Sequence, residues 1–147
     1  MSLADATDAA IAVTGGSGTA VPLTEADLAR LPATKLTVSF GKGPVAFEGP
    51  LLWTVLARSG AVDPTKPRGQ SRQIVMVTGS DGYVAVLALG EISPAFDGKQ
   101  VILADRMDGR PLDPGHFRVV VPGEQRGARS VRDVVGIAVT TPEPPGQ

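Results

Sequence analysis

The sequence predicts an α+β fold in which β-rich mixed sheets are joined by a few short helices. Glycine and proline are numerous, 18 and 13 of the 147 residues, and this favours many turns between short elements. Most runs between the turns are β-branched or alternate between apolar and polar residues, as strands do. Only two segments carry clear helix signals. Hairpin patterns stand on both sides of the second, so strict strand–helix–strand alternation is absent.

The first helix is expected at 25–31, after a short strand at 11–14 and a glycine-rich loop. Thr24 can cap this helix. Asp27, at its third position, can return a hydrogen bond to the backbone, as in a capping box. Pro32 then ends the helix, because proline cannot continue the hydrogen-bond ladder.

A hairpin followed by the second helix is predicted next. Residues 35–40 alternate in polarity and residues 45–48 form a second short strand, with Gly-Lys-Gly-Pro between them. Pro50 suits the first turn of a helix. Leu51 opens an apolar stripe at helical spacing, and Gly60 supplies the stop.

The rest of the chain predicts five further strands. Those at 73–78 and 83–89 flank a Gly-Ser-Asp-Gly turn, which is typical of an antiparallel hairpin. The others are expected at 101–104, 117–121 and 134–140. Their apolar runs indicate buried strands.

Length and composition predict one domain over residues 1–147, with flexible ends at 1–10 and 141–147. The apolar share of 42% supports a packed core. A net charge of −1 provides no basic field for nucleic acid. No apolar run reaches the roughly 18 residues that a membrane-spanning helix needs. We expect a periplasmic or secreted protein if a leader was removed, and a cytoplasmic one otherwise.

The chain contains no cysteine and a single histidine, His116. The absence of cysteine excludes disulfides, thiolate metal ligands, iron–sulfur clusters and cysteine nucleophiles within this chain. One histidine cannot make a histidine-rich metal site. We therefore predict no thiolate-bound metal.

The stretch at 117–139 is a candidate anion site, because a buried strand leads into a loop with Gly127 and several basic residues. Three arginines lie in this loop: Arg126, Arg129 and Arg132. Guanidinium groups bind phosphate through two parallel hydrogen bonds, and glycine lets backbone N–H groups approach an anion. The alternative is a solvated turn whose arginines pair with Glu124 or Asp133.

Several motifs around this stretch resemble the molybdopterin-binding domain of sulfite-oxidase-type enzymes. They are Asp108-Gly109-Arg110-Pro111-Leu112, then His116, then Arg118-Val119-Val120-Val121-Pro122-Gly123, then Gly127-Ala128-Arg129-Ser130-Val131-Arg132. Segments 47–60 and 77–89 are similar to the helix and the hairpin of the same family. The chain looks closest to small stand-alone members, and the resemblance implies the sulfite oxidase fold.

The resemblance also implies a cofactor, molybdopterin, and residues to hold it. In the family, the Gly-Ala-Arg segment and a histidine before the Val-Val-Pro-Gly strand hold the pterin and its phosphate. The corresponding candidates here are His116, Gly127, Arg129, Ser130 and Arg132. No catalytic residue can be assigned.

One departure from the family pattern bears on the chemistry. The family's molybdenum is held by a cysteine thiolate just after the strand that corresponds to 35–40, where this chain has Phe40 and Gly41. Conventional thiolate-ligated catalysis is therefore not expected. Two hypotheses follow. The chain binds a pterin cofactor or another small anion, or it is a non-enzymatic ligand-binding or protein-interaction module whose pocket Phe40 could close.

Overall fold

The computed structural model describes residues 10–39, 43–113 and 115–145. Its helices are α2 (Glu25–Ala29), α3 (Leu52–Arg58), α4 (Pro67–Gln70) and α5 (Leu89–Ile92). Its strands are β1 (Ala10–Thr14), β2 (Ala20–Thr24), β3 (Ala33–Val38), β4 (Val45–Pro50), β5 (Ile74–Gly79), β6 (Val84–Ala88), β7 (Ile102–Ala104), β8 (Arg106–Met107), β9 (Arg110–Pro111), β10 (Arg118–Val120) and β11 (Val134–Thr140). Short helices among many short strands confirm the predicted α+β class.

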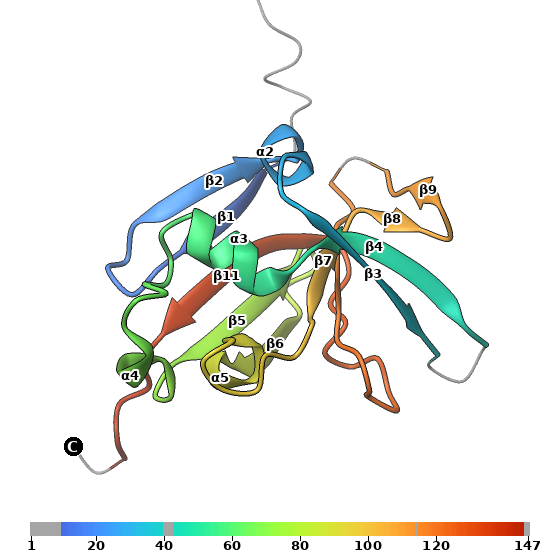
Figure 1. Ribbon diagram of the computed structural model, residues 1–147. Coiled ribbons are helices and arrows are strands. Elements are labelled where there is room, and N and C mark those ends of the chain that lie inside the picture. The colour runs from blue at the N-terminus through green and yellow to red at the C-terminus, as the bar shows by residue number, and fades with distance from the viewer. Residues whose placement is uncertain (1–9, 40–42, 114, 146–147) are drawn as a thin grey trace, which may run out of the picture.

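The largest sheet has five strands in the order β2-β1-β11-β5-β6. Strand β1 pairs with β11 in parallel, and the other neighbours are antiparallel. The last strand of the chain therefore lies in the middle of the sheet beside the first, as Figure 1 shows.

One face of this sheet carries the main core. Alternate residues of its strands point inward, and α3 and α5 pack against them (Figure 1). The inward side chains of the sheet include Ile11, Val13, Val75, Val77, Leu87, Ile137 and Val139. Each is at most 2% exposed. Helix α2 lies at the end of β2, and its predicted capping box is confirmed: Thr24 Oγ1 accepts from the Asp27 N–H at 3.2 Å, and Asp27 Oδ2 accepts from the Thr24 N–H at 2.9 Å.

A second layer is built from the four-stranded sheet β3-β4-β8-β9 and the two-stranded sheet β10-β7. A smaller apolar cluster joins them, in which Phe47 of β4 packs with Ile102 of β7 and Val120 of β10. The two sheets come very close at Gly49, where an added Cβ would lie 2.1 Å from the carbonyl oxygen of Leu103. Because β7 pairs with β10, this close approach also brings β10, which begins at Arg118, near the β3–β4 hairpin.

Two sequence expectations need correction. Pro50 does not open the second helix; it is the last residue of β4, because the pairing with β3 continues to Pro50 opposite Ala33. Strand β2 was not predicted, and it contains Pro22. Proline is tolerated there because β2 is an edge strand, where the missing N–H interrupts no ladder bond.

Candidate anion-binding site

A cavity of about 340 Å³ lies between the β3–β4 hairpin and the loop that follows β10. The hairpin provides apolar walls, and the loop provides polar groups. Its lining residues are Val38, Gly43, Val45, Phe47, Met107, Arg118, Gly127, Ser130 and Arg132. The volume falls at the lower end of the range of small-molecule sites. Three of the five site residues expected from the sequence therefore line one cavity, namely Gly127, Ser130 and Arg132.

Arg118, the first residue of β10, is the most buried cation of this cavity. Its Cζ lies 5.1 Å from the centroid of the Phe47 ring, within the range of a cation–π contact. Its Nε is buried and has no hydrogen-bond partner. Burial lowers the pKa of the Arg118 guanidinium, and the neighbouring Arg132 lowers it further. An arginine nevertheless stays charged at neutral pH. The fold therefore holds a cation here although burial removes part of the water that would solvate its charge.

Arg132 stands directly beside Arg118. The two residues form an isolated antiparallel bridge, and the Val119 N–H donates to the Val131 carbonyl at 3.0 Å. Within the part of the chain that the structure describes, neither guanidinium forms an ion pair. Two adjacent arginines without a carboxylate create a local positive potential, which a bound anion would neutralise.

Ser130 adds a hydroxyl to the same cavity. A tight turn positions it, in which the Ser130 N–H donates to the Gly127 carbonyl at 3.0 Å. The residue is 5% exposed, and its Oγ has no hydrogen-bond partner. Among the described residues, Ser130 Oγ and Arg118 Nε are the buried side-chain polar atoms left without a partner. Such atoms are rare in folded proteins and often mark the place of a missing ligand or water.

Arg129 points away from this cavity. Its guanidinium donates to both carboxylate oxygens of Glu91 at 2.9 and 3.0 Å, and to Glu124 Oε2 at 2.7 and 3.1 Å. It also donates to the Val86 carbonyl at 3.2 Å. The hydrogen bonds from Arg129 lower the pKa of Glu91 to about 2, and Glu91 raises the pKa of Arg129. For Arg129, the structure thus shows the pairing with Glu124 that the sequence left open as the alternative to anion binding.

His116 lies outside the cavity lining. Its Nδ1 is 2.6 Å from Asp133 Oδ1, and both side chains are about half exposed. Asp133 lines a neighbouring cavity of about 320 Å³, which shares Gly127, Ser130 and Arg132 with the first. His116 is therefore held at the border of the site through Asp133.

The predicted Gly-Ser-Asp-Gly turn at 79–82 and the Tyr83 that follows it also support this loop. The Tyr83 N–H donates to Asp81 Oδ1 at 3.0 Å, as expected for turn chemistry. The Tyr83 hydroxyl donates to the Ala128 carbonyl at 2.7 Å. Tyr83 thus ties the β5–β6 hairpin to the backbone between Gly127 and Ser130.

Sequence reasoning missed Arg118 as a site residue. Its signal was present: a charged residue opens an otherwise apolar strand, two positions before the buried Val120, on the same face of the strand. Phe40 and Gly41, which stand where the family resemblance implies a cysteine, lie outside the described residues. Of the described residues near them, Val38 and Gly43 line the cavity.

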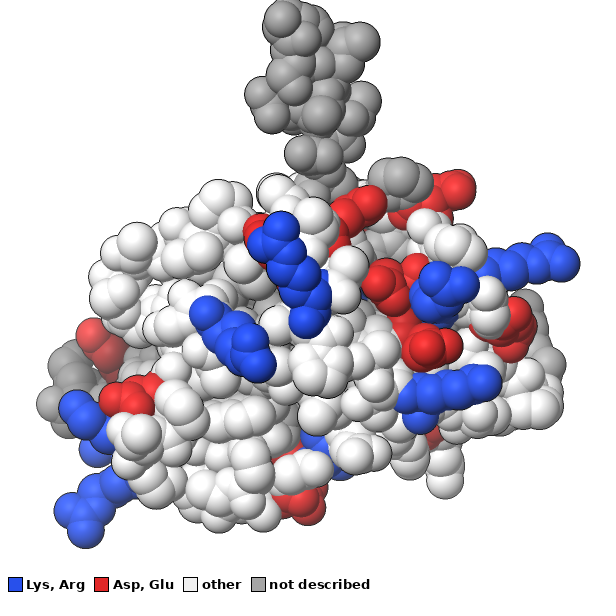
Figure 2. Space-filling view, turned by 45° about the horizontal axis from the view of Figure 1, so that its top comes forward, with Lys and Arg blue, Asp and Glu red and all other residues white. Residues whose placement is uncertain are grey.

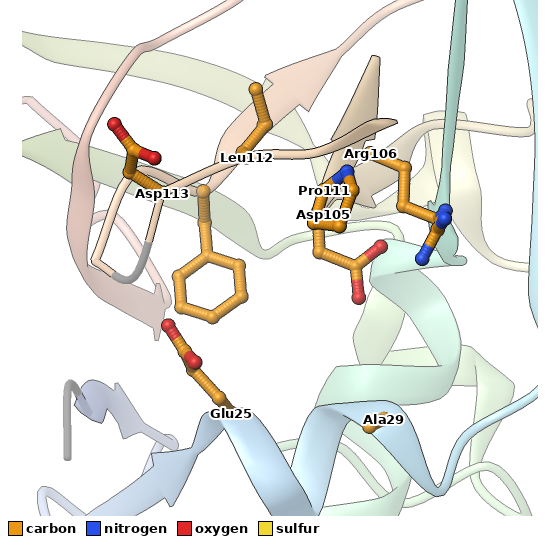
Figure 3. Close-up of a pocket in the computed structure, with 8 residues that line it drawn as sticks. Glu25, Ala29, Asp105, Arg106, Pro111, Leu112 and Asp113 are labelled. Carbon is orange, nitrogen blue, oxygen red and sulfur yellow. The ribbon is translucent and has the colours of Figure 1, made fainter. Parts of the chain in front are cut away.

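A smaller cavity of about 160 Å³ has the opposite charge. Glu25 and Asp105 direct their carboxylates into it, as Figure 3 shows. Burial raises the pKa of Asp105, and Glu48 and Glu25 add to this effect. This cavity therefore repels anions. Among the described residues no cluster of three or more His, Asp or Glu side chains is placed to hold a metal.

The charged residues form no extended field of one sign on the face shown in Figure 2, where basic and acidic side chains are interspersed over a largely uncharged surface. Within the described segments, no helix has the length and apolarity required to cross a membrane.

Comparisons with known proteins concern the family and the fold of this chain. The sequence pattern named "Oxidoreductase molybdopterin binding domain" matches residues 38–147. In structure, the chain is similar to the sulfane dehydrogenase SoxCD from Paracoccus pantotrophus, with a TM-score of 0.69 and 18% sequence identity over 90% of this chain. At that identity the likeness concerns the fold, and it covers 38% of the SoxCD chain. No curated protein matches the sequence.

Proposed function

This chain belongs to the oxidoreductase molybdopterin binding domain family, and on that premise we propose that it binds a phosphorylated pterin, or another small anion, in the cavity beside Arg118. Arg118 and Arg132 neutralise the anion, and the Ser130 hydroxyl completes its hydrogen bonds. The proposal does not include conventional thiolate-ligated molybdenum catalysis.

The proposal rests on two buried polar atoms that lack hydrogen-bond partners and belong to residues lining the same cavity. Arg118 Nε and Ser130 Oγ are both buried without a partner, and both residues line the cavity that Arg132 also borders. Leaving a buried polar group unsatisfied costs about 1–3 kcal/mol, more when it is charged. Two adjacent unpaired guanidinium groups add repulsion to that cost. A bound anion relieves both, because it accepts from the orphaned donors and neutralises the charges.

The residues fit the organic part of the family's cofactor. A phosphate suits the guanidinium groups of Arg118 and Arg132, and the apolar wall of Val38, Val45 and Phe47 suits a flat ring. When bound, such a cofactor supplies two-electron oxygen-atom transfer at molybdenum. This chain offers no cysteine to anchor that metal. Its own residues can bind and orient the anion, and a non-enzymatic ligand-binding role remains the second hypothesis.

The test begins with the full chain made in a host that synthesises molybdopterin. Bound pterin is measured as its fluorescent oxidised form, and molybdenum is measured separately. We expect pterin in the wild type and at least a ~10-fold loss in Arg132→Ala, since one hydrogen bond between charged groups is worth about 1.5–3 kcal/mol. Arg126→Ala is the matched control, because Arg126 is an exposed arginine of the same loop that does not line the cavity.

Thermal unfolding of the ligand-free protein provides an independent readout. Arg132→Ala removes a like charge beside Arg118, and Ser130→Ala removes an orphaned hydroxyl. Neither variant should be less stable than the wild type, although both should bind more weakly. If pterin is absent but phosphate stabilises the wild type and not Arg132→Ala, the ligand is a smaller anion. If neither pterin nor phosphate binds, the proposal is wrong.

A further inference from the structure

The outer face of the five-stranded sheet carries no charged side chain. The registers arrange its residues in two rows across all five strands. One row is Ala20, Thr14, Ala138, Met76 and Val86, and the other is Pro22, Ala12, Gly136, Thr78 and Val84. All ten residues are exposed or partly exposed. We name these ten residues the uncharged face.

The helices that the structure describes leave this face open, because the core and α3 lie on the opposite side of the sheet. Val84 and Val86 remain 43% and 44% exposed. The face is unusual because solvent-exposed sheet faces normally alternate with polar and charged residues. Large exposed apolar patches mark interaction surfaces in soluble proteins.

Both edges of the same sheet are blocked against strand addition. Pro22 lies in the edge strand β2, and proline lacks the N–H that a new strand would need. At the other edge, Arg129 donates to the outward carbonyl of Val86 at 3.2 Å. Tyr83 fixes the Ala128 carbonyl beside it. A partner is therefore expected on the face and not along an edge.

The shape of the uncharged face matches a second copy of itself. Large residues occupy one half, on β5 and β6, and small residues occupy the other, on β1 and β2. A two-fold axis along β11 places Met76 of one copy over Thr14 of the other, and Val86 over Ala20. Gly136 and Ala138 lie on the axis, where the two backbones must approach most closely. Because no charge is present, self-apposition buries none.

We propose that the chain forms a two-fold symmetric homodimer through the uncharged face. Five strands about 4.8 Å apart and five residues long, at about 3.3 Å each, give a footprint of roughly 400 Å² per copy. A standard interface buries about 800 Å² per partner, so this interface is a small one and the dimer should be weak and dependent on concentration. The two sheets pack with their strands nearly aligned, as in sandwich proteins.

Sedimentation equilibrium of the full chain, from about 1 to about 500 µM, measures the association. We expect a concentration-dependent dimer in the wild type. Met76→Lys and Thr14→Glu should each weaken it at least ~10-fold, because each buries a charge without a partner. An equimolar mixture of the two variants should recover association, since the axis brings Lys against Glu. Phe96→Lys is the control, because Phe96 is 48% exposed and lies outside this face.

Three outcomes would overturn the proposal. The wild type could stay monomeric over the whole range. A dimer could persist in Met76→Lys, with circular dichroism showing a folded protein, which would place the interface elsewhere. The mixed variants could fail to associate although each is folded, which would exclude this axis. If Met76→Lys does not fold, the pair Val86→Lys and Ala20→Glu replaces the first pair, because the same axis sets Val86 over Ala20.

Discussion

Removing the Arg129 guanidinium should destabilise the fold and leave anion binding intact. Arg129 holds two carboxylates at once, Glu91 through both oxygens and Glu124 through Oε2. In Arg129→Ala these two carboxylates lose their shared cation, and Lys99, 3.4 Å from Glu91, compensates only in part. The Val86 carbonyl at the edge of β6 also loses its donor.

The magnitude lies between two limits. Exposed ion pairs contribute about 0–1 kcal/mol, and breaking a buried pair costs about 3–5 kcal/mol. The side chains of Arg129, Glu91 and Glu124 are 27%, 24% and 25% exposed, so this network is intermediate. We expect a loss of about 2 kcal/mol, which corresponds to a fall in Tm of roughly 6 °C for a chain of this size.

Urea unfolding at pH 7 measures this loss, with Arg126→Ala as control because an exposed loop arginine should change stability by less than ~0.5 kcal/mol. Bound pterin, or stabilisation by phosphate, is measured in the same variants. The reasoning is refuted if Arg129→Ala keeps the wild-type stability but no longer binds. That result would mean that Arg129 leaves its carboxylates to hold the ligand, as the family resemblance implied.

Two further predictions concern pH and packing. The pKa of Glu91 falls from 4.5 to about 2 on folding, so its ionised form stabilises the fold above about pH 4.5, and this contribution disappears as the pH falls towards 2. Urea unfolding should therefore show Glu91→Gln to be about 1–2 kcal/mol less stable at pH 7, after allowance for partial exposure, with the difference closing below pH 4.5; a constant difference across that range would contradict it. Gly49→Ala should cost about 3 kcal/mol or more, since its Cβ would meet the Leu103 carbonyl at 2.1 Å. Gly43→Ala at the cavity, where an added Cβ meets no atom within 4 Å but φ is +86°, should cost less in the same measurement.

Local signals in the sequence predicted most elements, because their causes are themselves local. Thr24 and Asp27 form the expected capping box, and the 134–140 strand has the expected bounds. Two failures, at Pro22 and Pro50, share one cause. Proline lacks a backbone N–H, so it disfavours a strand only at positions where that N–H would donate a hydrogen bond to a neighbouring strand. Which positions these are depends on which strands become neighbours in the fold.

The candidate site was predictable only in part. Gly127, Ser130 and Arg132, three of the candidates that the motif suggested, line one cavity. Arg129 belongs to the same motif, yet it pairs with Glu91, which lies 38 residues earlier in the chain. Arg118 joins the site because its strand crosses against the β3–β4 hairpin.

The sequence by itself determined the α+β class, the family resemblance and the absence of any thiolate ligand. These depend on composition and on motifs that are contiguous in the chain. Only the tertiary structure decided which arginines line the cavity and which one is neutralised by carboxylates. An arginine in such a motif can bind a ligand, or it can stabilise its loop through ion pairs. Which of these it does depends on whether carboxylates such as Glu91 and Glu124 lie within ion-pair distance in the folded chain.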